Sequence, residues 1–466
     1  MYPIADFAAA IEGVPYSTDL ITLRTKSRDY YGISPLLRQA LGGRVADIVV
    51  MPRSVEEVAK VVKAAVAYRI PITPRGGGTA NYGQSVPSKG GIVMELTGLA
   101  GVTHVGGGTV RALGGTMMDV VDKVARESGW ELRIHPSTRT TATIAGFIAG
   151  GSGGMGSCAW GMLRDRGNVA GLTVMSVEGE PRIIELRGRD VELVHHAYGA
   201  NGIILEVEMP VAPAWEWREC IVAFPHFVDA AKFGVRLAKE AGILKKLISL
   251  QEWPVAELMA DLKGIVPEGH TMANCMIAQH TMDSFKCLVE DFGGVISSNH
   301  AEGKGPYPAP LYEYAYGHGL RQVQRSNPKF TALQGMFPSD RLIESISAVH
   351  SRYSGEMPLR LEVFFSEGEV VAMGSHYILF ENEKQMSDLV EFMQGEGVNV
   401  ANNHASGVRE VGIKVIDHRD ARFKRSMDPF NLLNPGKFDF ADDDEVKATE
   451  HSLPTKGWVF ADAKSA

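Results

Sequence analysis

Two glycine-rich segments constrain this chain more than any other feature of its sequence. The first reads PRGGGTANYG over residues 74–83, and the second reads TIAGFIAGGSGGMG over residues 143–156. The 51 glycines make up about 11% of the chain, against roughly 7% in an average protein, and most of the excess lies between residues 76 and 171. Glycine permits backbone conformations and close approaches that side chains forbid. The sequence therefore predicts two loops whose backbone packs closely against another group.

Several phosphate-binding motifs could account for such loops. Residues 151–156 match the G-x-G-x-x-G pattern of dinucleotide-binding proteins, and Glu178 follows at about the required 20 residues. In that motif the glycines follow a buried strand and open a helix, whereas Gly161 and Gly167 interrupt the residues that follow here. A P-loop is excluded because the chain has no G-x-x-x-x-G-K-[ST] sequence.

Two glycine loops about 70 residues apart suggest instead one ligand that is held from two sides. Backbone N–H groups in glycine loops and at helix N-termini bind pyrophosphate oxygens. Thr79 and Asn81 add short polar side chains to the first loop. We therefore expect a phosphate-containing ligand between the loops, with two tight structural turns that bind nothing as the alternative.

The composition excludes several classes of function. The net charge is −8 and no run of Lys or Arg exceeds two residues, so the chain lacks the electrostatic footprint of a nucleic-acid or anionic-membrane protein. The four cysteines form no C-x-x-C pair and are not spaced for a zinc or iron–sulfur site. No signal peptide and no run of about 18 apolar residues are seen. We expect a cytoplasmic protein without a membrane span.

Strand–helix–strand units precede both loops. Residues 45–52 and 70–74 read as strands, and between them Ser54 and Glu57 form a capping box ahead of an amphipathic helix. The second unit has a helix capped by Thr116 and ended by a glycine, followed by a strand.

The rest of the chain divides into two further parts. Pro210 and Pro213 mark a boundary, and beyond them strands and amphipathic helices alternate from residue 215 to about residue 403. The polar stretch over residues 439–466 is expected to wrap the surface or to fray.

Motifs along the chain resemble those of a known family. The matching sequences are PRSVEEV (52–58), PITPRGGGT (71–79), GGIVMEL (90–96), TIAG (143–146), GMLRD (161–165), YGANGII (198–204) and DPFNLLNPGK (428–437). In order and spacing they resemble the FAD-binding oxidoreductases of the vanillyl-alcohol oxidase / p-cresol methylhydroxylase type, and most nearly the glycolate oxidase and FAD-linked D-lactate dehydrogenase branch. The resemblance covers about residues 40–212 and the C-terminal motif.

This resemblance implies an α+β fold and a set of FAD contacts. A two-subdomain FAD-binding domain over residues 1–212 would be followed by an α+β substrate (cap) domain over residues 213–425. A C-terminal segment over residues 426–466 would return to the FAD domain. The implied cofactor contacts are Pro74, Arg75, Gly76, Gly77, Gly78, Thr79, Asn81, Gly83, Pro136, Thr143, Gly146, Gly150, Gly151, Gly153, Gly154, Gly202, Ile203, Ile204 and Asn434.

The resemblance also bears on how the flavin is attached. Some relatives tether it through a histidine in the first loop, and the matching position here is Thr79. Others use a cysteine just before the second glycine cluster, where this chain has threonines, and Cys158 falls too late in the motif. We therefore expect FAD to be bound non-covalently.

The chain departs from the metal motif of the glycolate and lactate branch. That branch carries a two-histidine metal site and a later Glu-His-Gly. Here the sequence GSHY over residues 374–377 keeps one histidine, and Asn403 stands where the later motif has its carboxylate. Losing a histidine and an anionic ligand leaves too few donors for a firm divalent site. We predict no catalytic metal.

Three histidines are candidates for the group that receives a substrate proton. They are His404, His318 and His376 in that order, because imidazole can accept a hydroxyl proton as the C–H passes to flavin. For each, a structural histidine is the alternative. His195 and His196 are interpreted as incidental.

A second set of residues is expected to contact the substrate. Arginines can pair with a substrate carboxylate through two hydrogen bonds, although surface ion pairs are the commoner role. Tyrosines near His318 suit a pocket wall but are also common in cores. The candidates are Tyr314, Tyr316, Arg321, Arg360 and Asn403.

Together these features predict an FAD-dependent dehydrogenase or oxidase. It would transfer a hydride from a small hydroxy-acid or alcohol substrate to flavin N5. A phenol- or aromatic-alcohol oxidase of the same superfamily is the first alternative, and a non-catalytic or electron-transfer FAD subunit of a complex is the second. The electron acceptor would be oxygen, a soluble carrier or a partner subunit, and the chain could form a homodimer.

Overall fold

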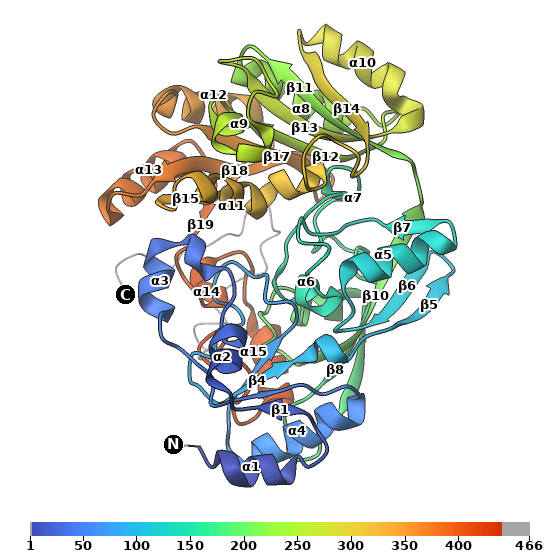
Figure 1. Cartoon of the computed structure of the whole chain (residues 1–466), viewed down its shortest axis with the longest axis vertical. Coiled ribbons are helices and arrows are strands. Elements are labelled where there is room, and N and C mark those ends of the chain that lie inside the picture. The colour runs from blue at the N-terminus through green and yellow to red at the C-terminus, as the bar shows by residue number, and fades with distance from the viewer. Residues whose placement is uncertain (1, 440–466) are drawn as a thin grey trace.

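The computed structural model describes residues 2–439 of the 466-residue chain, and these residues fold into three β-sheets covered by helices (Figure 1). The two smaller sheets make up the lower half of the view, and the largest sheet makes up the upper half. This mixture of helices and sheets confirms the predicted α+β class. The polar stretch after Asp439 lies outside the described residues.

The first sheet has four strands in the order β1-β2-β4-β3, with β2, β4 and β3 parallel. The strands are β1 (Tyr16–Ser17), β2 (Ile48–Val50), β3 (Ile72–Arg75) and β4 (Ile92–Glu95). Helix α4 (Val55–Tyr68) connects β2 to β3 and buries one apolar face on the sheet. Ser54 caps this helix as predicted, accepting a hydrogen bond from the Glu57 backbone N–H at 3.2 Å. The Glu57 carboxylate, however, accepts from the N–H of Arg53 and not from that of Ser54.

The second sheet is antiparallel, in the order β5-β6-β10-β8-β9, and β7 pairs with the far end of β10. Its strands are β5 (Val102–Gly106), β6 (Thr109–Leu113), β7 (Trp130–Leu132), β8 (Gly171–Met175), β9 (Ile183–Arg187) and β10 (Ile203–Pro213). Helices α5 (Met118–Glu127) and α6 (Ile144–Gly150) pack on it. Helix α5 begins two residues after Thr116, so Met117 and not the predicted Thr116 is its N-cap, and the Thr116 hydroxyl donates to the Leu113 carbonyl at 2.6 Å.

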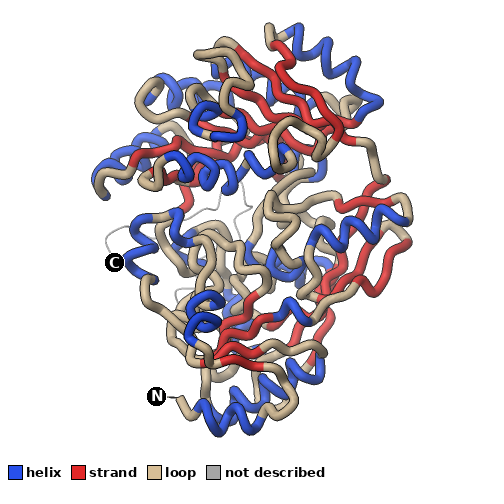
Figure 2. Tube along the Cα trace, viewed as in Figure 1, coloured by secondary structure: helices blue, strands red, loops and turns tan. Residues whose placement is uncertain are grey.

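The third sheet has nine strands, and all of its pairings are antiparallel. The main order is β14-β11-β13-β12-β17-β18-β16-β19, and β15 pairs with β18. The strands are β11 (Trp217–Phe224), β12 (Lys245–Gln251), β13 (Thr271–Ala278), β14 (Val295–Ala301), β15 (Phe330–Ala332), β16 (Gln334–Phe337), β17 (Leu359–Ser366), β18 (Glu369–Leu379) and β19 (Asn399–Ala401). Figure 2 shows these strands gathered in the upper half of the molecule.

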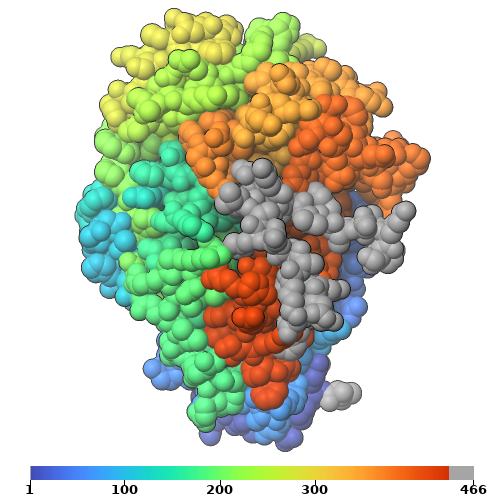
Figure 3. All heavy atoms as spheres, turned by 180° about the vertical axis from the view of Figure 1, so that it is seen from behind, coloured from blue at the N-terminus to red at the C-terminus, as the bar shows by residue number. Residues whose placement is uncertain are grey.

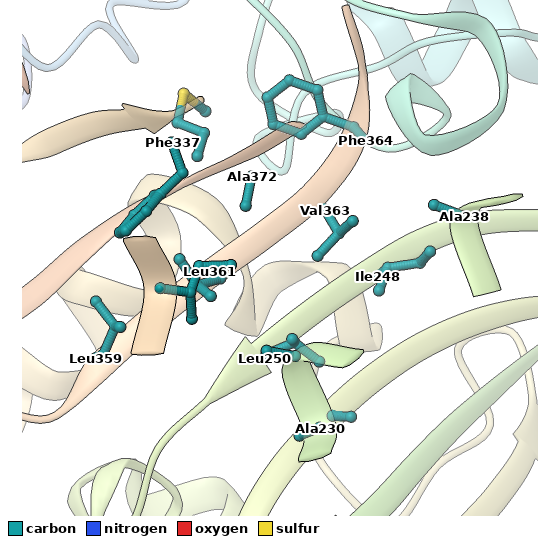
Figure 4. Packing of buried hydrophobic residues seen from close by; sticks show 14 of the residues in the cluster. Ala230, Ala238, Ile248, Leu250, Phe337, Leu359, Leu361, Val363, Phe364 and Ala372 are labelled. Carbon is teal, nitrogen blue, oxygen red and sulfur yellow. The ribbon is translucent and has the colours of Figure 1, made fainter. Parts of the chain in front are cut away.

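The two faces of the third sheet differ in what covers them. Four helices cover one face: α8 (Phe227–Lys239), α10 (Met282–Asp291), α12 (Leu342–Tyr353) and α13 (Glu383–Gly395). Alternate residues of the central strands, such as Ile248, Leu250, Leu361 and Val363, pack under them (Figure 4). The opposite face meets α9 (Val255–Leu258) and α11 (Tyr316–Ser326) and turns toward the smaller sheets. This second face carries polar residues that bear on the site.

The remaining helices are short. They are α1 (Ile4–Ala10), α2 (Leu20–Lys26), α3 (Pro35–Leu41), α7 (Ser157–Trp160), α14 (Val408–Val411) and α15 (His418–Met427), with six 3₁₀ helices at Tyr31–Ile33, Leu96–Gly98, Gly188–Leu193, Ala260–Leu262, Gln279–Thr281 and Leu311–Tyr314. Among residues 2–439, no helix is long and apolar enough to cross a membrane.

The C-terminal part of the described chain packs on the smaller sheets. The fully buried ammonium of Lys424 on α15 donates to the carbonyl of Ala200 at 2.9 Å and to the carboxylate of Asp428 at 2.7 Å. Leu433 forms a parallel bridge with Ile72 of β3. Figure 3 shows this segment in red on the rear of the lower half. The strand that leads into the first glycine loop is therefore held by residues from the other end of the chain.

Candidate functional site

A cavity with about 250 Å³ of water-accessible space lies between the smaller sheets and the largest sheet. Its walls come from the end of β3, the second glycine loop with α6, the start of β10, and the α11, β16, β17 and β18 region of the third sheet. The predicted cofactor residues in these walls are Pro74, Arg75, Gly76, Gly77, Gly78, Thr79, Asn81, Pro136, Thr143, Gly146, Gly150, Gly151, Gly153, Gly202, Ile203 and Ile204. Both glycine loops thus face one common space.

The first loop packs directly against the second. A Cβ atom on Gly76 would lie 2.0 Å from the Thr143 hydroxyl oxygen, and one on Gly77 would lie 1.8 Å from the Thr141 carbonyl oxygen. Gly78 has a left-handed backbone (φ +68°), and a Cβ there would meet the Arg75 guanidinium at 2.0 Å. These three glycines are therefore required by contacts within the protein as well as by the space that they leave in the cavity.

The second loop begins with a capped helix. The Thr143 side chain accepts a hydrogen bond from the Gly146 N–H at 3.2 Å and so starts α6 at the cavity wall. A Cβ on Gly154 would lie 2.2 Å from the His135 carbonyl, and one on Gly156 would lie 1.7 Å from the Arg133 carbonyl. The second loop is thus bound on its other side by the chain that leaves β7.

The third sheet also holds the second loop in place. The Gly156 N–H donates to the Lys246 carbonyl of β12 at 2.6 Å. The Tyr316 hydroxyl, from the start of α11, donates to the Gly154 carbonyl at 2.9 Å. Beside the loop, the buried Lys246 ammonium pairs with the Glu131 carboxylate at 3.1 Å. Residues of both halves therefore build the cavity wall together.

Unsatisfied polar atoms in the cavity wall fit a large polar ligand. The Gln84 Oε1 and His196 Nε2 are buried and have no hydrogen-bond partner among the described residues. Buried polar groups are nearly always hydrogen-bonded, so these atoms call for water or a ligand. Next to them, Gly76–Thr79 and Gly150–Gly153 present backbone with almost no side chain. This combination suits a cofactor that carries both ring heteroatoms and phosphates.

Two wall residues of this region were not predicted as cofactor contacts. The Nδ1 atom of His196 lies 3.0 Å from the Gly151 carbonyl, and burial lowers the pKa of its imidazole to about 4. His196 is therefore neutral at pH 7, although the sequence interpretation had treated it as incidental. Burial likewise raises the pKa of Tyr198 well above its usual range. No local sequence pattern indicates that these side chains would face a cavity.

Three predicted cofactor residues lie just outside the cavity wall. A Cβ on Gly83, which has a φ of +73°, would meet Leu41 at 2.1 Å. Gly154 has its carbonyl occupied by Tyr316. Asn434 is fully buried and donates to the carbonyls of Gln84 and Tyr198 at 2.8 and 2.7 Å. Asn434 therefore supports the wall from behind.

Among the three candidate histidines, only His318 lines the cavity. It lies on α11, and its Nδ1 is 2.6 Å from the Glu313 carboxylate. The Nδ1 of His404 lies 2.7 Å from the Ser34 hydroxyl, and burial lowers its pKa to about 4. His376 is fully buried on β18, packs its ring edge against Tyr353, and has a pKa lowered by burial to about 3.

The candidate substrate residues also separate into two groups. Tyr316, Arg360 and Asn403 line the cavity. Tyr314 is fully buried and donates its hydroxyl hydrogen to Asp261 at 3.0 Å, and Arg321 places its guanidinium 3.5 Å above the Tyr30 ring. Neither of these two reaches the cavity wall.

Arg360 is the charged residue that β17 presents to the cavity. Its Nη1 donates to the Glu362 carboxylate at 2.8 Å and to the Tyr316 carbonyl at 2.7 Å. Nearby, Tyr82 donates its hydroxyl hydrogen to Gln334, and burial raises the pKa of Tyr82 to about 12. Tyr82, Gln334 and Met373 were missed from the sequence because they come from three separate segments that meet only in the fold.

The donors needed for a firm metal site are not grouped in the described structure. Within residues 2–439, no cluster of three or more His, Cys, Asp or Glu residues is placed to hold an ion. Cys158, Cys220 and Cys275 are buried, and all four cysteines are free thiols.

Comparison with known proteins identifies the cofactor domain. A family described as FAD binding domain matches residues 46–185. Glycolate oxidase subunit GlcD of Bacillus subtilis is 26% identical over 431 residues, which cover 85% of this chain and 89% of that protein. D-Lactate dehydrogenase of Archaeoglobus fulgidus is 28% identical over 204 residues, 41% of this chain and 45% of that protein. D-2-Hydroxyglutarate dehydrogenase of Xanthomonas citri pv. viticola is 29% identical over 191 residues, 38% of this chain and 40% of that protein.

Solved structures show that the fold extends over nearly the whole chain. Alkyldihydroxyacetonephosphate synthase superposes with a TM-score of 0.67 at 16% sequence identity, over 94% of this chain and 86% of that one. The predicted fold class is thereby confirmed. The family match covers the glycine loops and the sheets around them, which supports FAD as the cofactor. This chain is an FAD-linked oxidoreductase, similar in sequence to glycolate oxidase subunit GlcD and to D-lactate dehydrogenases.

Proposed function

We propose that this protein oxidises a small hydroxy acid or alcohol at the end of the cavity lined by α11 and β17. Relatives named for glycolate, D-lactate and D-2-hydroxyglutarate support a hydroxy-acid substrate. Bound FAD supplies the hydride acceptor, flavin N5. The protein's own part is to bind and orient the substrate and to receive the hydroxyl proton.

His318 is the proposed proton acceptor, and its contact with Glu313 is the observation that carries this assignment. A carboxylate at one ring nitrogen fixes the orientation and the tautomer of an imidazole, which leaves the other nitrogen as the acceptor. The 2.6 Å contact between His318 Nδ1 and Glu313 does this for a ring that lines the cavity. His404 and His376 have no comparable carboxylate partner at 4 Å or less among the described residues. This order reverses the one favoured by the sequence, which put His404 first.

Arg360 is the proposed contact for a substrate carboxylate, and Asn403 is a second candidate in the same cavity wall. The Arg360 guanidinium lines the cavity, and its Nε has no partner within residues 2–439. A guanidinium can hold a carboxylate through two parallel hydrogen bonds. Tyr316 is proposed to shape this end of the cavity rather than to bind substrate, because its hydroxyl is already bonded to Gly154.

A phenol or aromatic alcohol is the second candidate substrate. Tyr82, Leu333 and Met373 line the same end of the cavity and give it an apolar surface that would accept a ring. The carboxylate contact would then be unnecessary. The third reading, an FAD subunit without catalysis, requires that no hydroxy compound reduces the flavin.

The way in which the cofactor is held belongs to the same proposal. We infer that FAD is bound without a covalent link. Thr79 stands at the first-loop position where some relatives carry the histidine that tethers the flavin, and Cys158 is a buried thiol away from the cavity wall. The division at residues 212 and 425, a cytoplasmic location, a homodimer, and the identity of the electron acceptor also stay predictions.

Anaerobic reduction of the flavin tests the function. The holoprotein is mixed with glycolate, D-lactate, D-2-hydroxyglutarate, benzyl alcohol and 4-hydroxybenzyl alcohol, and the loss of oxidised flavin absorbance is followed. His318→Ala should slow reduction by about 10²–10⁴-fold, the usual contribution of a general base, and Glu313→Gln by about 10-fold or more. His226→Ala, at an exposed histidine without a capping bond, is the matched control.

Two results would count against this proposal. Reduction by none of these compounds would favour the non-catalytic reading. If the flavin of His318→Ala is reduced at the same rate as that of the His226→Ala control, His318 does not take part in the reaction. Acid precipitation completes the experiment, because non-covalent FAD is released to the supernatant and a yellow pellet would contradict our inference.

A further inference from the structure

Glu362 shares the cavity arginine with any ligand that binds there. Arg360 and Glu362 stand two residues apart on β17, so their side chains point to the same face of the sheet. The guanidinium and carboxylate are 2.8 Å apart and nearly inaccessible to solvent, with 7% and 1% of the two residues exposed. The positive charge that Arg360 presents to the cavity is therefore already balanced by a buried negative charge.

The Glu362 carboxylate is only partly satisfied. Its Oε1 accepts hydrogen bonds from Arg360 and from the Tyr316 N–H, the latter at 2.9 Å. Its Oε2 is buried and makes no well-aligned hydrogen bond in the described part of the chain. Ser249 stands directly opposite on β12, and its buried hydroxyl interacts with the Glu362 carboxylate. A proton on Oε2 would have this hydroxyl beside it as an acceptor, because a serine hydroxyl can turn from donating a hydrogen bond to accepting one.

A second carboxylate at Arg360 changes this balance. Two carboxylates that share one site cannot both stay ionised without a large electrostatic cost, so the pKa of one of them rises strongly. Burial already raises the pKa of Glu362 above its usual range, despite the opposing effect of Arg360. An anionic ligand would be held by Arg360, whereas Glu362 is fixed in the sheet behind it.

We propose that binding of a carboxylate ligand at Arg360 is coupled to the uptake of one proton by Glu362, so that Glu362 sets which charge state of the site accepts an anion. The inference rests on the proposed function for the presence of a carboxylate on the ligand. The proton comes from solvent and stays on Glu362 Oε2 while the ligand is bound. An uncharged ligand of the same shape binds without proton uptake.

Other groups around Glu362 are less suited to take this proton. Tyr316 on α11, Tyr377 on β18 and Tyr82 beside the first loop face the pair, and burial raises the pKa of each hydroxyl, so all three stay neutral and protonated. From β12, the neighbours are the uncharged Ser249 and Gln251. His318 on α11 also lines the cavity, with Glu313 at its Nδ1. It is the one competing acceptor that the experiment must separate.

Calorimetry on the oxidised holoprotein measures the proton directly. Phenylacetate and propionate are titrated beside phenylacetamide and propionamide, none of which carries an oxidisable hydroxyl, in two buffers of different ionisation enthalpy. At neutral pH and above we expect close to one proton per carboxylate bound and none per amide. The Kd for the carboxylates should rise about tenfold per pH unit in this range, because ionised Glu362 opposes the ligand.

Glu362→Gln keeps the side-chain shape and the acceptor for Tyr316 but removes the titration. We expect this variant to bind phenylacetate at least tenfold more tightly at neutral pH, without proton uptake. Glu369→Gln, at an exposed carboxylate on the same hairpin, is the control and should behave as the wild type. Carboxylate binding without proton uptake, no carboxylate binding, or uptake that persists in Glu362→Gln and so belongs to His318 would each overturn the inference.

The test does not depend on whether the Glu362→Gln variant folds, because the proton count on the wild type alone decides whether carboxylate binding takes up a proton. It is also separable from the proposed function. Flavin reduction by hydroxy acids together with proton-neutral carboxylate binding would reject only the role of Glu362. Proton-coupled carboxylate binding with no flavin reduction by any hydroxy compound would reject only the proposed oxidation.

Discussion

Gly77→Ala is the substitution that most directly tests how the two glycine loops build the FAD site. The new methyl carbon would lie 1.8 Å from the Thr141 carbonyl oxygen, whereas ordinary contacts begin at 3.4 Å. The opposing atom belongs to backbone just before α6, so it cannot turn aside as a flexible side chain would. Gly77 does not have a left-handed backbone, and the cost is therefore one of packing between the loops.

The size of the effect follows from where the strain can go. Overpacking of this kind costs about 1–3 kcal/mol, and we expect the upper end because the contact is with backbone. If the loops stay together, the apoprotein loses this stability. If the first loop yields, it moves toward the cavity that it lines, and about 3 kcal/mol then appears as a roughly 100-fold weaker Kd for FAD. The two losses should sum to about 3 kcal/mol.

Thermal unfolding of the apoprotein and titration of the apoprotein with FAD measure the two losses separately. Gly179→Ala is the matched control, because a Cβ there meets nothing within 4 Å and its backbone is not left-handed. We expect the control to match the wild type in both measurements. A Gly77→Ala protein with unchanged melting temperature and unchanged FAD affinity would show that the contact between Gly77 and Thr141 does not constrain the loops.

Two further predictions concern Tyr316 and the buried histidines. Tyr316→Phe removes the bond to the Gly154 carbonyl and should cost about 1–3 kcal/mol of holoprotein stability with an unchanged KM; a raised KM at full stability would instead make Tyr316 a substrate contact. Burial lowers the pKa of His196, His376 and His404 to about 4, 3 and 4, so the unfolded chain takes up their protons first as the pH falls. For each group the free energy of unfolding should be at its full value above about pH 6.5 and should fall toward pH 4 by up to about 1.4 kcal/mol per pH unit. Denaturant unfolding at each pH measures this, and a free energy of unfolding that does not change over this range would contradict the burial of these rings.

The sequence predicted best those features that depend on neighbouring residues. The strand, cap and helix over residues 45–68 were recovered because the apolar spacing and the Ser54 cap are local signals. The capping prediction at Thr116 was wrong because the helix begins one residue later than the pattern implies, with Met117 as its N-cap. The FAD cofactor was predicted from motif order, and the family match confirms it.

The end of the cavity lined by α11 and β17 could not be predicted in the same way, because it depends on which way side chains point after the sheets meet. Tyr314 and Tyr316 are two residues apart, yet one hydroxyl donates to Asp261 and the other to the Gly154 carbonyl of the second glycine loop. The sequence singled out Arg360 as a candidate contact for a substrate carboxylate, which stays a prediction. It did not indicate the partner Glu362, since nothing in the sequence marks that face of β17 as buried.

The contacts of the second glycine loop explain why its sequence alone was ambiguous. Of its glycines, Gly154 and Gly156 approach carbonyls of the chain after β7, and they also bond to Tyr316 of α11 and Lys246 of β12. A loop that is glycine-rich because it is wedged between two halves of a protein has the same composition as one that only binds phosphate. The difference is that the wedged loop is also bonded to the third sheet and to α11. Tyr316 joins the Gly154 carbonyl of this loop to Arg360 and Glu362 of β17, so we expect substitutions at Tyr316 to alter both the glycine loop and the environment of Arg360.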